Sequence, residues 1–223
     1  SHRCGYYTAH YDPGDPNSLI YFAKGAPLCM DFGHRGASGE EVNTMWRPDY
    51  HTAVSFDRPA PHHYWGASVG TPDASRQGQE VRSLPNIIDY SSGVSFGGGG
   101  QQNNRHVLLV KSKDPLGANY VVMRDITKDG QPHQSFTWNL WCLAKEPEIT
   151  GNVAHFPGQF GVDLDAHVLT PTEPQFIKDK YGYEQWVFPW WGMGKLREDQ
   201  TAVHVKKAGS KEDFFTVLYP RAE

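Results

Sequence analysis

The sequence predicts an all-β fold, an antiparallel β-sandwich of many short strands with little helix, and three observations support this prediction. Short runs of β-branched and aromatic residues recur along the chain, several with strict alternation of apolar and polar residues, a pattern typical of strands with one buried face. The 23 glycines and 16 prolines are spread between these runs rather than gathered in one linker, as expected of turns. No amphipathic helix pattern continues over about 11 residues. We therefore expect residues 1–223 to form a single β-sandwich domain.

The expected strands share an enrichment in valine, isoleucine, phenylalanine, tyrosine and tryptophan between turn signals. They are 18–22, 52–56, 106–110, 120–124, 135–141, 162–169, 185–188, 202–205 and 214–219. The clearest alternation is in 162–169, where Val162, Leu164 and Val168 are separated by polar residues such as Asp163 and Asp165. One face of that strand is therefore predicted to be buried and the other to be wet.

Turn chemistry predicts the connections. The sequence Lys128-Asp129-Gly130 lies between two strand runs and is the clearest hairpin candidate. Two stretches, 59–79 and 97–104, have the composition of long loops. The glycine run 97–100 lacks the Gly-Lys-Ser/Thr ending of a phosphate-binding loop, which favours a mobile connection.

Charge, hydropathy and cysteine content limit the function classes. The net charge is −4 with no lysine- or arginine-rich run, so the sequence offers no electrostatic footprint for nucleic acid or a membrane surface. No apolar run approaches the ~18 residues of a membrane span. The three cysteines, Cys4, Cys29 and Cys142, allow at most one disulfide and do not form a thiolate zinc motif. Cysteine content leaves the cellular compartment open.

A possible metal site lies in the first third of the chain. His10 precedes an expected strand, Asp31 ends the next one, and His51 begins a later one. If these strand ends converge on one side of a sheet, two imidazoles and a carboxylate form a common ligand set for zinc or a similar divalent ion. With 11 histidines in the chain, the alternative is that these histidines form hydrogen bonds with turns.

A series of motifs keeps its order along nearly the whole chain. It comprises Ala9-His-Tyr-Asp12, the stretch 17–33 with Gly25-Ala-Pro-Leu28 and Asp31-Phe-Gly33, the stretch 43–57, the strand pair around 105–111 and 120–125, and Phe214-Phe-Thr-Val-Leu-Tyr-Pro220. Together these motifs resemble the C-terminal β-sandwich domain of the heparinase II/III family of polysaccharide lyases.

This resemblance implies a function and a site. In the family the sandwich follows an α/α toroid, and His10, Asp31 and His51 match the metal-ligand positions, with zinc as the expected divalent ion. The implied substrate is an acidic, uronate-containing polysaccharide cleaved by β-elimination, and the implied location is periplasmic or secreted. Thr8 stands where the family often has a second histidine.

Much of the family's catalytic set lies on the toroid, so the isolated sandwich is expected to be inactive or poorly active. Tyr50, beside His51, is the local candidate for the phenolic acid or base. The alternative is an aromatic side chain that packs on a neighbour.

Aromatic residues near 186–191 suggest a second kind of site. Trp190 and Trp191 could stack on sugar rings, although dense tryptophans also pack in cores and between domains. Two alternatives to a lyase domain follow: a non-catalytic carbohydrate-binding module and a structural or assembly module.

Overall fold

The computed structural model describes residues 2–3, 17–30, 48–56, 80–96, 100–114, 116–130, 135–186 and 195–222. Within these residues the regular structure is β-strand apart from one short 3-10 helix, η1 (Pro48–Tyr50). The all-β fold class is therefore confirmed. No helix in the described part of the chain is long and apolar enough to cross a membrane.

The described strands are listed here in chain order. The first eight are β1 (His2–Arg3), β2 (Ser18–Leu19), β3 (Tyr21–Ala23), β4 (Ala26–Cys29), β5 (Val54–Phe56), β6 (Glu80–Leu84), β7 (Ile88–Phe96) and β8 (Gln102–Val110). The remaining strands are β9 (Tyr120–Lys128), β10 (Ser135–Cys142), β11 (Glu148–Thr150), β12 (Val153–Phe156), β13 (Val162–Thr170), β14 (Phe176–Trp186), β15 (Lys195–Ala208) and β16 (Phe214–Ala222).

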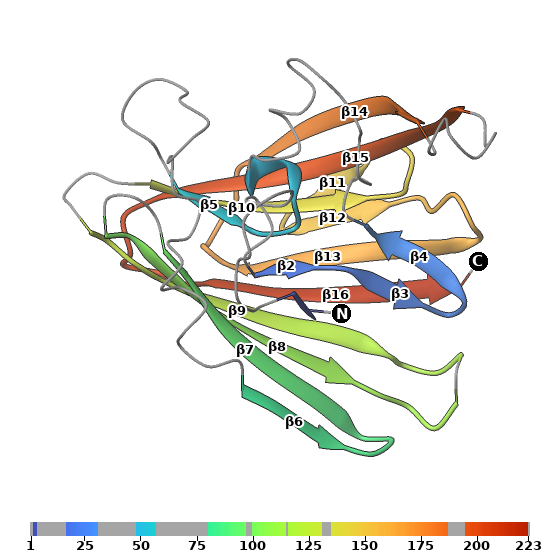
Figure 1. Cartoon of the computed structure of the whole chain (residues 1–223), viewed down its shortest axis with the longest axis horizontal. Helices are drawn as coiled ribbons and strands as arrows, with labels where there is room; N and C mark the ends of the chain where they lie inside the picture. The colour runs from blue at the N-terminus through green and yellow to red at the C-terminus, as the bar shows by residue number, and fades with distance from the viewer. Residues whose placement is uncertain are drawn as a thin grey trace.

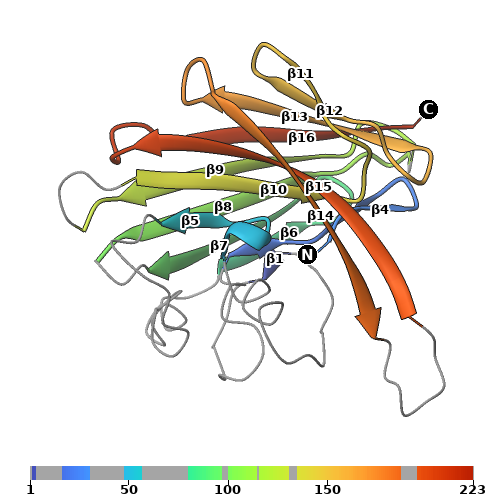
Figure 2. The same ribbon diagram turned by 90° about the horizontal axis from the view of Figure 1, so that it is seen from above.

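The strands form two large antiparallel sheets. An eight-stranded sheet has the order β11-β12-β13-β16-β9-β8-β7-β6, and a four-stranded sheet has the order β14-β15-β10-β5. In Figure 1, β14 and β15 lie along the top of the molecule and β6 to β9 form the lower part of the larger sheet. Figure 2 shows the long pair β14 and β15 crossing in front of the strands of the larger sheet. The small pair β3–β4 contacts both sheets, because β4 touches β10 and β13.

Alternating side chains from both sheets form the core between them. The four-stranded sheet contributes Phe136, Trp138, Leu140, Val203 and Val205, and the eight-stranded sheet contributes Val121, Met123, Phe156, Leu164, Phe214 and Leu218, all of them buried. The predicted alternation of 162–169 is confirmed, since buried and partly exposed residues alternate from Val162 to Val168. This pattern is the sandwich architecture that the sequence predicts.

Two local predictions were wrong. Lys128-Asp129-Gly130 does not close a hairpin, because β9 belongs to the eight-stranded sheet and β10 to the four-stranded one. The segment connects the two sheets instead. Residues 102–104, expected in a loop, begin β8. These residues form a strand although they are polar. One of them, Asn103, is buried and donates a hydrogen bond to Asp125 at 2.8 Å.

Gly158 gives a stability prediction about the turn between β12 and β13. A Cβ atom at this position would lie 1.8 Å from the carbonyl oxygen of Val162, and a backbone atom cannot rotate away as a side chain can. We expect Gly158→Ala to lower the free energy of unfolding by about 3 kcal/mol or more. Urea denaturation measures this loss.

The matched control is Gly151→Ala. A Cβ atom at Gly151 would have no atom within 4 Å, and the φ of this residue is +58°. The substitution should therefore lower the free energy of unfolding only by the cost of the left-handed backbone conformation, about 1–2 kcal/mol. Equal losses in the two variants would show that the close approach at Gly158 does not matter.

Candidate functional site

The structure describes two of the predicted site residues, Tyr50 and His51. His10 and Asp31 of the predicted metal site, and Trp190 and Trp191 of the predicted sugar platform, lie outside the described residues. The loop expected at 59–79 also lies outside them. The geometry around Tyr50 and His51 is therefore the part of the candidate site that can be built.

Tyr50 ends η1, and His51 follows it in a bend rather than at the start of a strand. The expected strand 52–56 begins only at Val54. The residues before it form hydrogen bonds with β10 that do not belong to a strand ladder. The indole nitrogen of Trp141 donates to the carbonyl of Asp49 at 2.7 Å, and the Trp141 amide donates to Thr52 Oγ1 at 3.2 Å. Both ends of the bend are thus tied to β10.

His51 is almost completely buried, with 3% of its surface exposed. The next carbonyl, that of Thr52, accepts hydrogen bonds from the Leu19 amide at 3.1 Å and from Arg105 Nη1 at 2.6 Å. The same Arg105 nitrogen donates to the carbonyl of Asn17 at 2.7 Å. One guanidinium, that of Arg105, therefore binds two segments: the one that contains His51 and the one that leads into β2.

Asp125 fixes the orientation of that guanidinium. Arg105 Nε lies 2.7 Å from one carboxylate oxygen of Asp125 and Nη2 lies 3.0 Å from the other. Both side chains are fully buried. Such a two-point ion pair has one preferred geometry, so β8 and β9 set the position of the backbone next to His51.

Tyr50 belongs to a cluster on the face of the four-stranded sheet that points away from the core, which we call the Trp141 cluster: Tyr50, Asn139, Trp141, Asp179 and His204. The ring of Tyr50 stacks on Trp141 with centroids 5.6 Å apart and planes 15° apart. His204 meets Trp141 edge-on at 5.8 Å. Tyr50 thus makes the packing contact that was the alternative expectation for it, and its acid or base role stays a prediction.

The hydrogen bonds of the Trp141 cluster define the tautomer of His204. Asn139 Nδ2 donates to the carbonyl of Ala53 at 3.0 Å, so Asn139 Oδ1 is the atom that accepts from His204 Nδ1 at 2.7 Å. The proton of the neutral ring is then on Nδ1. Nε2 of His204 faces Asp179 Oδ2 at 3.6 Å, where it can accept a proton.

Burial lowers the pKa of His204 below its ordinary value of 6.5, and the nearby carboxylates of Asp179 and Asp49 oppose this shift only in part. The neutral ring therefore stabilises the folded state at and above neutral pH. As the pH falls below about 6.5, the unfolded chain binds a proton that the folded chain does not, and stability is lost until the lower folded pKa is reached.

We expect His204→Asn to remove this part of the pH dependence. The free energy of unfolding of the parent chain should fall more steeply between neutral pH and the folded pKa of His204 than that of the variant. Urea titrations at a series of pH values measure both slopes. Equal slopes would show that His204 titrates alike in the folded and unfolded chain.

Sequence reasoning did not single out Asn139, Trp141 or His204. The signal available was the period of two in 135–141, which puts Asn139 and Trp141 on the opposite face from Trp138 and Leu140. The pairing of Asn139 with His204 and of Trp141 with Ala202 between β10 and β15 is long-range and was not encoded locally.

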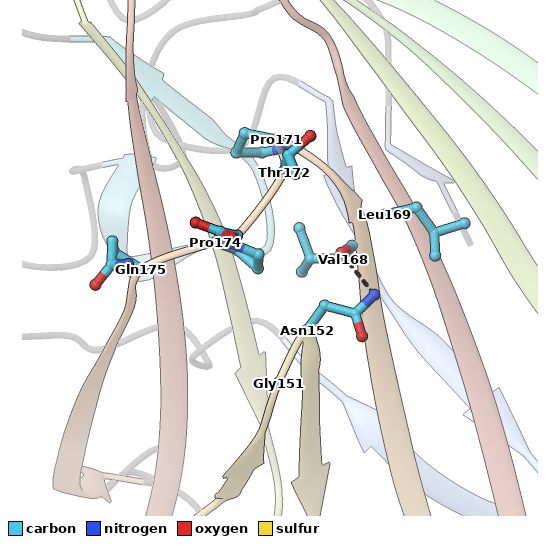
Figure 3. A pocket seen from close by; sticks show the side chains of 9 residues that line it. Gly151, Asn152, Val168, Leu169, Pro171, Thr172, Pro174 and Gln175 are labelled. Carbon is cyan, nitrogen blue, oxygen red and sulfur yellow. Dashed lines mark hydrogen bonds between the residues drawn. The ribbon is translucent and has the colours of Figure 1, made fainter.

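A pocket of about 450 Å³ lies where the β11–β12 turn meets the segment after β13. Figure 3 shows Asn152 and Val168 on one side of it and Pro171 and Pro174 on the other, with the hydrogen bond from Asn152 Nδ2 to the Val168 carbonyl. Glu173 is the one charged residue of its lining. A carboxylate disfavours an acidic ligand, so this pocket does not suit an acidic glycan.

A metal site cannot be assembled from the described residues alone, since no group of three or more histidine, cysteine, aspartate or glutamate side chains there could hold an ion. Of the three predicted ligands, His51 is the one that the structure describes. A buried imidazole suits zinc, and the predicted set of His10, Asp31 and His51 stays a prediction.

Comparison of the fold with solved structures finds polysaccharide lyases. Heparan sulfate lyase HepC from Pedobacter heparinus matches with a TM-score of 0.65 and 16% identity, over 94% of this chain and 31% of that one. A heparinase III with methylated lysines matches with a TM-score of 0.73 and 15% identity, over 100% of this chain and 32% of that one. Another heparinase III gives a TM-score of 0.58 at 10% identity, over 94% and 30% of the two chains.

No family model and no curated protein matches the sequence. The chain spans about a third of the length of the lyase chains it matches. The resemblance to the heparinase II/III family that the sequence motifs suggested is confirmed at the level of the fold: this chain has the fold of a segment of heparinase III and heparan sulfate lyase chains.

Proposed function

We propose that this chain is the C-terminal β-sandwich domain of a polysaccharide lyase that cleaves an acidic, uronate-containing glycan by β-elimination. The observation that carries the proposal is the match of 94% and 100% of the chain to lyase structures at TM-scores of 0.65 and 0.73. The order of the sequence motifs supports the same family. Heparan sulfate is the first substrate to test, because it is the substrate named for one matched structure.

In β-elimination a base removes the proton at C5 of the uronate, a positive or hydrogen-bonding group neutralises the carboxylate, and an acid protonates the leaving oxygen. The proposal assigns an upstream toroid domain most of these groups and gives the sandwich one wall of the cleft. In this account His51 contributes to a metal site with His10 and Asp31, and a bound divalent ion supplies positive charge.

Tyr50 is the proposed acid or base on the sandwich side. Its stacking on Trp141 holds the ring in one orientation, which a proton donor requires. The Trp141 cluster and the Arg105–Asp125 pair thus support adjacent residues, Tyr50 from the outer face of the sheet and His51 through the Thr52 carbonyl.

The lyase proposal is tested by incubating the full-length protein with heparan sulfate and measuring the ultraviolet absorbance of the unsaturated uronate product. We expect product from the full-length protein and little or none from residues 1–223 alone. A full-length protein that binds heparan sulfate but never releases unsaturated product, on this or other acidic glycans, would favour a carbohydrate-binding module instead.

Tyr50→Phe separates the two roles of Tyr50. Phenylalanine keeps the ring that stacks on Trp141 and removes the hydroxyl. If Tyr50 is an acid or base, the variant should lose about 100-fold or more in kcat, while its free energy of unfolding should fall by no more than the ~1.5 kcal/mol of one hydrogen bond. If Tyr50 only packs, the variant should keep its activity.

The metal proposal has a separate readout. Protein purified without chelator should contain about one equivalent of a divalent metal by elemental analysis, and His51→Ala should lower this content. Full-length protein that is metal-free when purified in this way would refute the metal part and leave the lyase part standing.

A further inference from the structure

Two cysteines that are far apart in the sequence lie side by side in the core. Cys29 ends β4 and Cys142 ends β10, and their Sγ atoms are 3.7 Å apart. Both thiols are buried, with 0% and 1% of the residue surface exposed. Each sulfur is in contact with the other across 113 positions of the sequence.

The backbone beside the two thiols is already joined. The amide of Leu143 donates to the carbonyl of Leu28 at 2.9 Å, so the residues next to Cys142 and Cys29 are hydrogen-bonded. A disulfide has an S–S distance of about 2.05 Å, which leaves a gap of roughly 1.7 Å. Small rotations of the two side chains can supply that movement without separating β4 from β10.

We propose that Cys29 and Cys142 are a disulfide site, oxidised by exchange with a disulfide-bearing oxidant. One thiolate attacks the donor disulfide, forms a mixed disulfide and releases the first donor thiol. The second cysteine then attacks the mixed disulfide through its own thiolate and releases the other donor thiol. The two protein thiols lose two hydrogens in total, and the donor is reduced to two thiols.

Burial decides when this exchange takes place. Burial raises the pKa of the Cys142 thiol well above its ordinary value, and the adjacent Cys29 raises it further. Since the thiolate is the attacking species and burial keeps a donor disulfide away from both sulfurs, the folded chain with both thiols reduced should exchange slowly. The bond should therefore form during folding, before β4 closes over the end of β10.

The disulfide would attach the small β3–β4 pair to the four-stranded sheet. β3 and β4 pair with each other in a two-stranded sheet of their own, so their attachment to β10 depends on packing and on the bond between Leu143 and Leu28. A covalent link that closes a long loop removes chain entropy from the unfolded state. Such a link is kept in oxidising compartments, so the inference also bears on the expected periplasmic or secreted location without depending on lyase activity.

The test uses the full chain with Cys4→Ser, because Cys4 is the one rival partner among the three cysteines. The chain is unfolded, refolded in a mixture of oxidised and reduced glutathione, and digested without reduction for mass spectrometry. We expect a linked peptide pair that contains Cys29 and Cys142, lighter by the two thiol hydrogens than the separate peptides. Most refolded molecules should then lack both free thiols.

Stability provides the second measurement. The oxidised chain should unfold at a higher urea concentration than the same chain refolded with excess reductant. The matched control, Cys4→Ser with Cys29→Ala, should show the same midpoint in both redox conditions. Three results would overturn the proposal. These are the survival of both free thiols after oxidative refolding, glutathione adducts on the single cysteines, and a lower urea midpoint for the linked chain.

Discussion

Arg105→Met is expected to lower the free energy of unfolding by about 3–5 kcal/mol, because it leaves the buried carboxylate of Asp125 without its partner charge. Arg105 and Asp125 are both fully buried and joined at 2.7 Å. The same substitution also removes the donor to the carbonyls of Asn17 and Thr52. Urea denaturation measures the loss.

The control for this prediction is Arg124→Met. Arg124 immediately precedes Asp125 on β9 and forms an ion pair with Asp213 at 2.7 Å, but the Arg124 side chain is 57% exposed. An exposed pair of this kind contributes about 1 kcal/mol or less. The double variant Arg105→Met with Asp125→Leu should recover part of the loss, since it removes the unpaired charge. Similar losses from Arg105→Met and Arg124→Met would contradict the role assigned to burial.

Trp138→Ala should lower the free energy of unfolding by about 3–5 kcal/mol, because it empties the volume of a fully buried tryptophan between the two sheets. Trp138 is completely buried, and its indole nitrogen has no hydrogen-bond partner in the described part of the chain. Trp138→Phe should therefore cost much less than Trp138→Ala, since it keeps most of the ring and removes a buried donor that lacks a partner.

Denaturant unfolding of both Trp138 variants measures this difference. Phe160→Ala serves as the surface comparison, because Phe160 is 57% exposed and its loss should stay within about 0.5 kcal/mol. If Trp138→Ala were no worse than Phe160→Ala, the core placed between the two sheets would be wrong.

The sequence predicted strands well where one face is apolar and the other polar. β13 is the clearest example, because its alternation survives in the burial of Val162 to Val168. The start of β8 was missed because Asn103 and Arg105 are buried polar residues, and their partner Asp125 lies on another strand. A hydrophobicity pattern cannot reveal a strand whose buried face is stabilised by an ion pair and hydrogen bonds.

Sheet membership was also hidden from the sequence. Lys128-Asp129-Gly130 has the chemistry of a tight turn, but turn chemistry does not specify whether the next strand pairs with the last one or joins the other sheet. The contact between Cys29 and Cys142 is hidden for a similar reason, since it depends on where β4 lies against β10. Long-range packing decides both features.

The roles predicted for Tyr50 and His51 stay predictions. His51 was singled out from its place near a strand start and from the motif order, and Tyr50 from its place beside His51, whereas the groups that hold them, Trp141 and Arg105, were not singled out. Those groups act through a ring stack and through backbone carbonyls, and neither kind of contact leaves a local sequence pattern. Residue types with acid-base or metal-ligand chemistry can thus be singled out from a sequence, whereas the residues that position them cannot.

The most direct test of the central claim is the rate of unsaturated uronate formation by the full-length protein carrying His51→Ala, compared with the parent protein on heparan sulfate. The proposal that this sandwich forms one wall of a lyase site predicts a loss of about 100-fold or more in kcat, since a bound metal supplies several kcal/mol of charge stabilisation. Circular dichroism and the urea midpoint, measured on the same samples, establish that the variant is folded. Full activity in folded His51→Ala, with its metal content unchanged, would contradict the claim that this domain contributes His51 to the reaction.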